Sequence, residues 1–366
     1  MKACVTGGTG FVGAHVVAAL LRRGDEVRVT VRDRRRLRAL AGLEVEVVDA
    51  DILDRRAMRR ALAGCDLLFH TAGVVASRPH NKVWRANAVA PRIAVEEAAR
   101  VGVGRVVITS SVASIGPAPA DRAATERNPY PPGGTGLLYT DSKHEGEQVA
   151  LGAADRLGLD AVSVCPSYVL GPAHNRGLPG ETSTRIVANY LRGRLPAVVD
   201  AYTNIVDVED VAQGHLLAAV RGRPGERYIL GGENLRWSEV VDRIARISGV
   251  RHPLIVLPPE VVGIANALKR ARVPLGILEG IRLMAPDWRY SSARARRELG
   301  YSPRRANETL RRTVAWYTEL IEDDRLAAPR SRSFDVMTAG VGMANRLGLL
   351  GPLRAAGQVA GRRTVL

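Results

Sequence analysis

The sequence predicts an α/β fold in which a doubly wound parallel sheet is joined to a smaller mixed α/β domain. Two observations predict it. Short apolar segments of strand character alternate with helical segments, which is typical of βαβ units in a parallel sheet. The first of these segments also runs directly into a glycine-rich turn and a helix. We expect the strands near residues 2–6, 27–31, 44–48, 67–70, 105–110, 161–165 and 227–230.

The first strand, turn and helix predict a dinucleotide site. Gly7, Gly10 and Gly13 follow the spacing G-x-x-G-x-x-G, and the segment after them has helical apolar spacing up to Gly24. Backbone amides of such a turn, together with the helix N-terminus, receive a pyrophosphate in the Rossmann fold. The alternative is a glycine loop that only turns the chain, but the second strand follows at the distance that a βαβ unit requires. The other turn residues expected to contact the cofactor are Thr9, Phe11 and Val12.

The residues after the second strand bear on the choice of cofactor. Arg32 comes directly after this strand, followed by Asp33 and three further arginines. An arginine here accommodates the 2′-phosphate of NADP, whereas an acidic residue binds the ribose 2′-hydroxyl of NAD. We therefore expect NADP(H), with Arg32 as its contact. NAD, with Asp33 as the hydroxyl ligand, is the alternative, and the arginine run is also compatible with a solvated helix start.

Tyr139 and Lys143 form a candidate proton-transfer pair. On a helix, residues four apart share a face, so the ammonium of Lys143 is expected near the phenol of Tyr139. A neighbouring cation favours the ionised form of tyrosine, whose free pKa is about 10. Such a tyrosine can exchange a proton with a carbonyl or an alcohol. The alternative, a surface tyrosine beside a solvated lysine, is weakened by the glycine turn in the same chain.

With these features, residues 1–320 resemble the extended short-chain dehydrogenase/reductase family. Thr109 to Gly116 is similar to the family's active-site serine segment and implies that Ser111 is catalytic with Tyr139 and Lys143. Asn87 stands where the family keeps an asparagine, and residues 290–301 resemble its closing motif. The cofactor contacts that the resemblance implies are Asp51 and Ile52 at the adenine, Thr71, Ala72 and Gly73 along the cofactor, Tyr139 and Lys143, and Pro166, Ser167 and Val169 beside the nicotinamide.

Two branches of this family compete. Residues 27–33 are similar to the NADP-selecting stretch of dihydroflavonol 4-reductases, whereas residues 191–197 and 225–234 resemble bacterial hopanoid-associated sugar epimerases. The resemblance implies an NADP(H)-dependent oxidoreductase that interconverts a ketone and a secondary alcohol on a small molecule. The alternatives are a nucleotide-sugar epimerase with retained NAD and a non-catalytic dinucleotide-binding protein. A dehydratase is disfavoured because Thr140 and Asp141 stand where a paired acid and base would be expected.

The domain organisation follows from this pattern. We expect a dinucleotide-binding domain at 1–165 and 206–230, and a substrate domain at 166–205 and 231–325. The proline- and glycine-rich segment 113–137 is either a lid or wall over the catalytic centre or an irregular connection. For the tail, 326–366, four roles stay open: packing on its own domain, covering the pocket, joining subunits, or peripheral contact with a membrane.

Composition excludes several other classes. The net charge is +16, but the chain has only four lysines and 4% aromatic residues, so arginine bias explains the charge better than nucleic-acid binding does. Three cysteines give no disulfide framework, and the histidines, among them His70, His80 and His144, lack metal-ligand spacing. No apolar run is long enough to span a bilayer, and no signal peptide is evident. We expect a cytoplasmic homodimer without metal that acts on a small-molecule carbonyl or alcohol.

Overall fold

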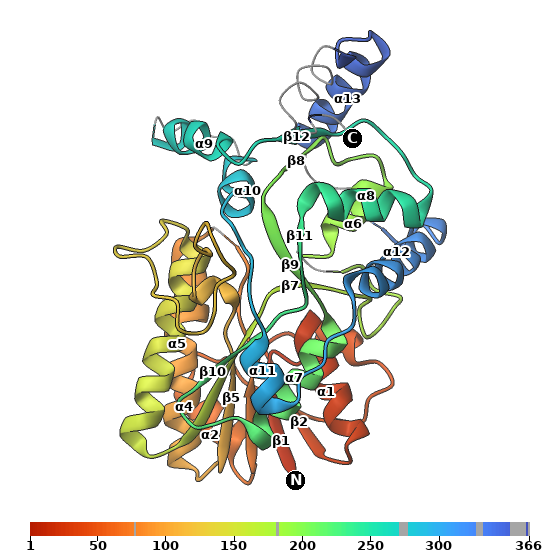
Figure 1. The fold of residues 1–366 in the computed structure, drawn as a ribbon. Coiled ribbons are helices and arrows are strands. Elements are labelled where there is room, and N and C mark those ends of the chain that lie inside the picture. The colour runs from red at the N-terminus through yellow and green to blue at the C-terminus, as the bar shows by residue number, and fades with distance from the viewer. Residues whose placement is uncertain (77, 181–182, 271–276, 327–331, 352–363, 365–366) are drawn as a thin grey trace.

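The computed structural model describes the protein at residues 1–76, 78–180, 183–270, 277–326, 332–351 and 364. Its centre is a seven-stranded parallel sheet in the order β10-β6-β5-β4-β1-β2-β3 (Figure 1). All seven expected strands are present, with bounds shifted by two residues at most. They are β1 Lys2–Thr6, β2 Glu26–Val31, β3 Glu46–Asp49, β4 Leu67–His70, β5 Arg105–Thr109, β6 Asp160–Pro166 and β10 Arg227–Leu230.

Helices cover both faces of this sheet, as predicted. α1 Phe11–Arg22 and α7 Val208–Arg221 pack together on one face, with α11 Ala293–Leu299 against α7 and β10. The other face carries α2 Arg55–Leu62, α4 Ala90–Arg100 and α5 Leu138–Leu157 (Figure 1). Each face buries an apolar core, for example Val16 and Leu20 on one side and Met58 and Leu62 on the other. Short helical turns complete this part: η1 Arg34–Leu40, α3 His80–Trp84, η2 Arg85–Val89 and η3 Val112–Ser114.

A smaller mixed α/β part lies beside the carboxyl ends of the central strands. It contains the sheet β11-β9-β7 and the parallel pair β12-β8. Its core surrounds Trp237 and Trp316. The strands are β7 Tyr168–Leu170, β8 Ala197–Val199, β9 Tyr202–Asp207, β11 Glu233–Arg236 and β12 Ile255–Leu257, and the packed helices are α6 Arg185–Leu191, α8 Trp237–Ser248 and α12 Ala306–Glu322. The doubly wound sheet with an added mixed α/β part is thus confirmed, while the exact domain bounds stay a prediction.

Segment 113–137 is bound to a segment far along the chain. The backbone of Ala118 donates to the carbonyl of Asp287 at 2.7 Å, and that of Ala124 donates to Arg289 at 2.9 Å. The hydroxyl of Tyr290 donates to the carbonyl of Gly116 at 2.6 Å. Backbone pairing of this kind fixes the connection between Ser111 and Tyr139 against residues 287–291.

The end of the molecule away from the central sheet consists of α9 Val261–Arg270, α10 Ile277–Met284 and α13 Arg332–Arg346, beside β8 and β12 (Figure 1). Thr364 lies there as well, since its carbonyl accepts a hydrogen bond from the amide of Val256 at 2.9 Å. Across the described residues, no helix combines the length and the apolar character needed to cross a membrane.

Candidate functional site

A cavity of about 370 Å³ lies where the carboxyl ends of β1, β4, β5 and β6 face the smaller sheet. The strand order reverses between β1 and β4, and ligands of open α/β sheets bind at such a switch point. Every strand end at this point contributes to the lining. The predicted site residues in this lining are Gly7, Gly10, Phe11, Val12, Gly13, Thr71, Gly73, Ser111, Tyr139, Lys143, Pro166, Ser167 and Val169.

The glycine turn fits the backbone of a dinucleotide because no side chain would have room there. A Cβ on Gly13 would lie 2.2 Å from the carbonyl oxygen of Gly7 and 2.6 Å from the hydroxyl of Thr71. Gly7 has a φ of +70°, and a Cβ on it would lie 2.6 Å from the Cα of Ala72. The turn therefore packs directly on the end of β4 and leaves the N-terminus of α1 open to the cavity. Thr9 and Ala72 belong to these turns without lining the cavity.

A second cavity of about 360 Å³ lies at the ends of β2 and β3, and Val74 lines both cavities. The predicted residues Arg32, Asp51 and Ile52 line it. This cavity is also lined by two further cationic residues, Lys82 and Arg85, which were not predicted from the sequence. A signal was available, since these basic residues stand three apart just before Asn87.

The charged groups of this second cavity are not equivalent. The Arg32 guanidinium is 4.0 Å from the Asp51 carboxylate and largely exposed. Asp33, by contrast, accepts from the backbone of Arg35 at 3.1 Å and pairs with its guanidinium at 2.9 Å, which lowers the pKa of Asp33. Because the Asp33 carboxylate caps the following helical turn, it is engaged within its own segment.

Tyr139, Lys143 and Ser111 meet at the cavity, Tyr139 and Lys143 from successive turns of α5 and Ser111 from the end of β5. The Lys143 ammonium donates to the carbonyl of Thr109 at 3.0 Å, and a Cβ on Gly73 would lie 3.2 Å from it. Burial lowers the pKa of Lys143 to about 8, with Glu147 opposing the shift.

The pKa of Tyr139 is raised, whereas the sequence predicts that the charge of Lys143 lowers it. Burial raises it, and a hydrogen bond with Ser111 lowers it, without a resolved contribution from Lys143. The physical reason is the direction of the lysine, whose ammonium is bound by the Thr109 carbonyl rather than by the phenol. Ser111, and not Lys143, is therefore the residue whose contact lowers the pKa of the Tyr139 phenol.

Helix α5 is fixed by two buried polar side chains. The Asn87 carboxamide binds both backbone groups of Val74 at 2.8 and 2.9 Å and donates to Ser142 at 3.1 Å. Glu147 accepts from Ser114 at 2.7 Å, beside Ser111, and pairs with Arg227 at 3.3 Å. The role of Glu147 was missed, although it stands one turn after Lys143 on the same helix.

The remaining wall of the cavity is mostly apolar and aromatic, and the neutral polar residues in it are Thr109, Ser110, Ser183, Thr203 and Asn204. Among the described lining residues Lys143 alone carries a charge. Of segment 113–137, all of which the structure describes, Ala113 is the residue that lines the cavity. Its later residues Ala118 and Ala124 bind the backbone of residues 287–289 instead. Sequence reasoning missed most of this wall, which comes from distant segments. Its members are Val74, Val75, Val112, Tyr168, Trp237, Leu283, Met284, Trp288 and Tyr290.

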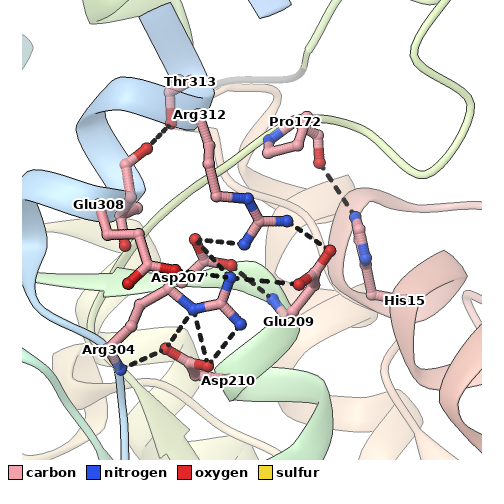
Figure 2. Close-up of polar contacts among 10 residues, drawn as sticks. His15, Pro172, Asp207, Glu209, Asp210, Arg304, Glu308, Arg312 and Thr313 are labelled. Atoms are coloured by element: carbon pink, nitrogen blue, oxygen red, sulfur yellow. Dashed lines mark hydrogen bonds and ion pairs between the residues drawn. The ribbon is translucent and has the colours of Figure 1, made fainter.

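An ion-pair network joins the start of α7 to α12 (Figure 2). Asp207 and Glu209 both pair with Arg312, Asp207 at 3.1 Å. Arg304 binds Asp210 at 2.9 Å. Burial raises the pKa of Asp207 to about 6, although the hydrogen bond from the Glu209 amide and the charge of Arg304 act against it. Because α7 packs on α1, this network connects the smaller part to the helix that follows the glycine turn.

The histidines have structural contacts. His144 lies 2.8 Å from the carbonyl of Ser114 and stacks on Tyr130, and His70 lies 2.8 Å from the hydroxyl of Thr6. In the part of the chain that the structure describes, no group of three His, Cys, Asp or Glu residues could hold a metal ion. The three cysteines are buried and free.

Comparison with known proteins places the chain in a family. The model of the NAD dependent epimerase/dehydratase family matches residues 3–231. Sterol demethylase protein B of Methylococcus capsulatus is 36% identical over 330 residues, which cover 87% of this chain and 99% of that protein. A putative dihydroflavonol 4-reductase of Synechocystis is 34% identical over 325 residues, covering 86% and 93%. The crystal structure of gox2253 is similar with a TM-score of 0.78 at 31% identity, covering 89% of this chain and 99% of that one. The chain therefore belongs to the NAD dependent epimerase/dehydratase family, the extended short-chain dehydrogenases/reductases, in its dihydroflavonol 4-reductase-like branch.

Proposed function

We propose that the protein is an NADP(H)-dependent oxidoreductase that interconverts a ketone and a secondary alcohol on an uncharged, largely apolar molecule. One observation carries the proposal: Ser111, Tyr139 and Lys143 meet at a cavity whose other described walls are apolar or neutral. A carbonyl needs a proton donor and a hydrogen-bond donor at its oxygen, and these residues supply both.

Each residue has a defined task in this reaction. Tyr139 gives its proton to the carbonyl oxygen during reduction and takes it back during oxidation, while Ser111 donates a hydrogen bond to the same oxygen. Lys143 would bind the ribose hydroxyls, and its position at the Thr109 carbonyl next to Gly73 supports this role. When bound, the nicotinamide supplies or accepts the hydride. The bare backbone at Gly7 and Gly13 fits the pyrophosphate.

The second cavity supports NADP(H) over NAD. Arg32, Lys82 and Arg85 surround it, which suits a 2′-phosphate, because charge-assisted hydrogen bonds are about twice as strong as neutral ones. Asp33, the ligand expected for a free 2′-hydroxyl, is engaged by Arg35.

Two alternatives are less well supported. A nucleotide-sugar epimerase must bind a diphosphate in its substrate half, yet the described lining there offers no cation apart from Lys143. The named relatives favour a reductase, and sterol demethylase protein B is named for an apolar substrate. A non-catalytic binding protein would not need the complete set of Ser111, Tyr139 and Lys143.

Turnover assays test the proposal. The purified protein is mixed with NADPH or NADH and either a panel of cyclic and long-chain ketones or UDP-glucose, and absorbance at the nicotinamide band is followed. We expect stoichiometric loss of NADPH with at least one apolar ketone. Tightly retained NAD, together with interconversion of UDP-glucose without net absorbance change, would contradict the proposal in favour of an epimerase.

A further inference from the structure

A buried carboxyl group, that of Glu147, lies next to the proposed catalytic residues without being one of them. Glu147 stands one turn after Lys143 on α5, so the two side chains share a face of the helix. The side chain of Glu147 is 0% exposed, and Glu147 is not among the residues that line the cavity. It therefore needs an explanation other than direct contact with a substrate or a cofactor.

Both oxygens of this carboxyl group accept hydrogen bonds from other elements. The partners of Glu147 are the hydroxyl of Ser163 at 2.5 Å and the thiol of Cys165 at 3.3 Å at Oε1, and the hydroxyl of Ser114 at 2.7 Å and the guanidinium of Arg227 at 3.3 Å at Oε2. An ionised carboxyl group is an acceptor only, and a guanidinium stabilises its charge. The contacts therefore fit a carboxylate rather than a carboxylic acid.

Glu147 is also the negative charge that acts on Lys143. Burial lowers the pKa of Lys143 to about 8, and the charge of Glu147 opposes this shift. The other titratable groups around Lys143 are uncharged, because burial raises the pKa values of Cys165 and Tyr139 and lowers that of His70 to about 3. Among the described groups that act on the ammonium, Glu147 is therefore the one that favours its protonated form.

The same carboxylate is linked to Ser111. The hydroxyl of Ser114 contacts the Glu147 carboxylate at 2.7 Å and the carbonyl of Ser111 at 2.8 Å. Ser111 begins this turn, since its side-chain oxygen accepts from the amide of Ala113 at 3.1 Å. One buried group thus contacts the turn that carries Ser111 and acts on the charge of Lys143.

We propose that Glu147 is a positioning residue of the site, whose carboxylate maintains the positive charge of the Lys143 ammonium and holds the Ser111 turn against α5. Arg227 on β10 supplies the opposite charge that a buried carboxylate needs. A charged Lys143 has three N–H donors, of which the Thr109 carbonyl takes one and leaves the others for ribose hydroxyls. This last step rests on the proposed function, whereas the effect of Glu147 on the charge of Lys143 does not.

Nuclear magnetic resonance of the lysines tests the charge effect without any ligand. The chain has only four lysines, so protein labelled with ¹³C at the lysine Cε gives few resonances, and Lys143→Arg identifies the one of Lys143. In the original protein this resonance should titrate near pH 8. In Glu147→Gln, which keeps the size of the side chain but removes its charge, it should titrate about one pH unit lower or more.

A matched control removes a hydrogen bond of Glu147 and keeps its charge. In Ser163→Ala the carboxylate loses the hydroxyl at 2.5 Å, and Lys143 should titrate as in the original protein. Glu147→Gln/Arg227→Gln leaves neither partner as an unpaired charge, so it decides the matter where Glu147→Gln does not fold. An unchanged titration of Lys143 in a folded Glu147 variant, or an equal change in Ser163→Ala, would overturn the proposal. Loss of folding in both Glu147 variants would do so too, because it makes Glu147 a residue of the core alone.

Affinity for NADPH as a function of pH gives the second readout. Fluorescence titration should show that Glu147→Gln loses affinity at a pH about one unit lower than the original protein, in step with the titration of Lys143. Affinity that does not follow the charge of Lys143 would contradict the positioning role. A changed Lys143 titration in a protein that reduces no ketone would refute the proposed function and leave the effect of Glu147 on Lys143 intact.

Discussion

At the scale of single residues, Tyr139 is the group on which the proposed chemistry depends. Its hydroxyl is bound to Ser111 at the cavity, and Lys143 is turned to the Thr109 carbonyl. We propose Tyr139 as the residue of the cavity lining that donates a proton to the carbonyl of the substrate. The spacing of the pair in the sequence thus predicts the location of the proposed proton-transfer group, whereas the direction of the Lys143 ammonium depends on the carbonyl of Thr109 at the end of β5.

Replacing Tyr139 by phenylalanine removes the transferred proton and little else. We expect Tyr139→Phe to lower turnover by roughly 100-fold or more while affinity for NADPH changes little. Steady-state rates and fluorescence titration measure the two quantities. Tyr190→Phe is the control, since its hydroxyl binds the carbonyl of Val250 outside the cavity and its loss should leave turnover intact. A Tyr139→Phe enzyme of normal rate would remove the mechanism.

Cofactor preference is also decided by single residues. If Arg32 contacts the 2′-phosphate, Arg32→Ala should remove most of a preference for NADPH over NADH worth about 1.5–3 kcal/mol. Calorimetric titration with both nucleotides measures it. Arg34→Ala is a close control, because Arg34 is paired with Asp49 at 2.7 Å and should not affect the preference. Equal affinity of the original protein for the two nucleotides would assign the choice to other groups.

At the scale of elements, the glycine turn between β1 and α1 depends on the absence of side chains. Gly13→Ala would place a Cβ 2.2 Å from the Gly7 carbonyl, so either the turn or the end of β4 must move. We expect loss of dinucleotide binding by at least about tenfold and a lower unfolding temperature, since overpacking typically costs about 1–3 kcal/mol.

The control for this element is a glycine inside a helix. Gly152→Ala on α5 would meet only the flexible end of Arg156, at 3.5 Å. It should leave binding unchanged and raise stability by up to about 1 kcal/mol, because alanine is the better helix former. Equal behaviour of the two variants in thermal unfolding and titration would show that the turn tolerates a side chain.

At the scale of the whole molecule, buried histidines make folding sensitive to acid. Burial lowers the pKa of His15 and His215 to about 4 and that of His70 to about 3. The unfolded chain, with histidine pKa values near 6.5, binds more protons between about pH 6.5 and 4, so stability falls as the pH falls through this range. Asp207 opposes this, since its raised pKa of about 6 adds stability below that pH.

The net change in the free energy of unfolding should be a loss of roughly 3–5 kcal/mol between pH 7 and pH 5. Urea unfolding at the two pH values measures it. His215→Gln should reduce the loss by about 2 kcal/mol, whereas His80→Gln, on an exposed side chain, should leave it as it is. Stability that stays constant between these pH values would contradict the assignment of neutral buried histidines.

The sequence by itself determined the elements and the cofactor turn. Most of the central strands were predictable because strands buried on both faces form short apolar runs, and the glycine turn was predictable because its spacing is local. The edge strand β3 is only partly buried. The i, i+4 spacing likewise placed Tyr139 and Lys143 on one helix face. These features depend on residues that lie close together along the chain.

Only the tertiary structure determined which residues surround Tyr139 and Lys143 in the cavity. Trp237, Leu283 and Trp288 enter the cavity wall through the packing of segments more than 90 residues away from Tyr139. Lys82 on α3 and Arg85 on η2 join Arg32, which follows β2, at the second cavity. No local periodicity predicts these long-range contacts, because burial of the shared core brings loops and side chains from separate segments together. The charge and shape of a binding site are therefore set by the fold as a whole.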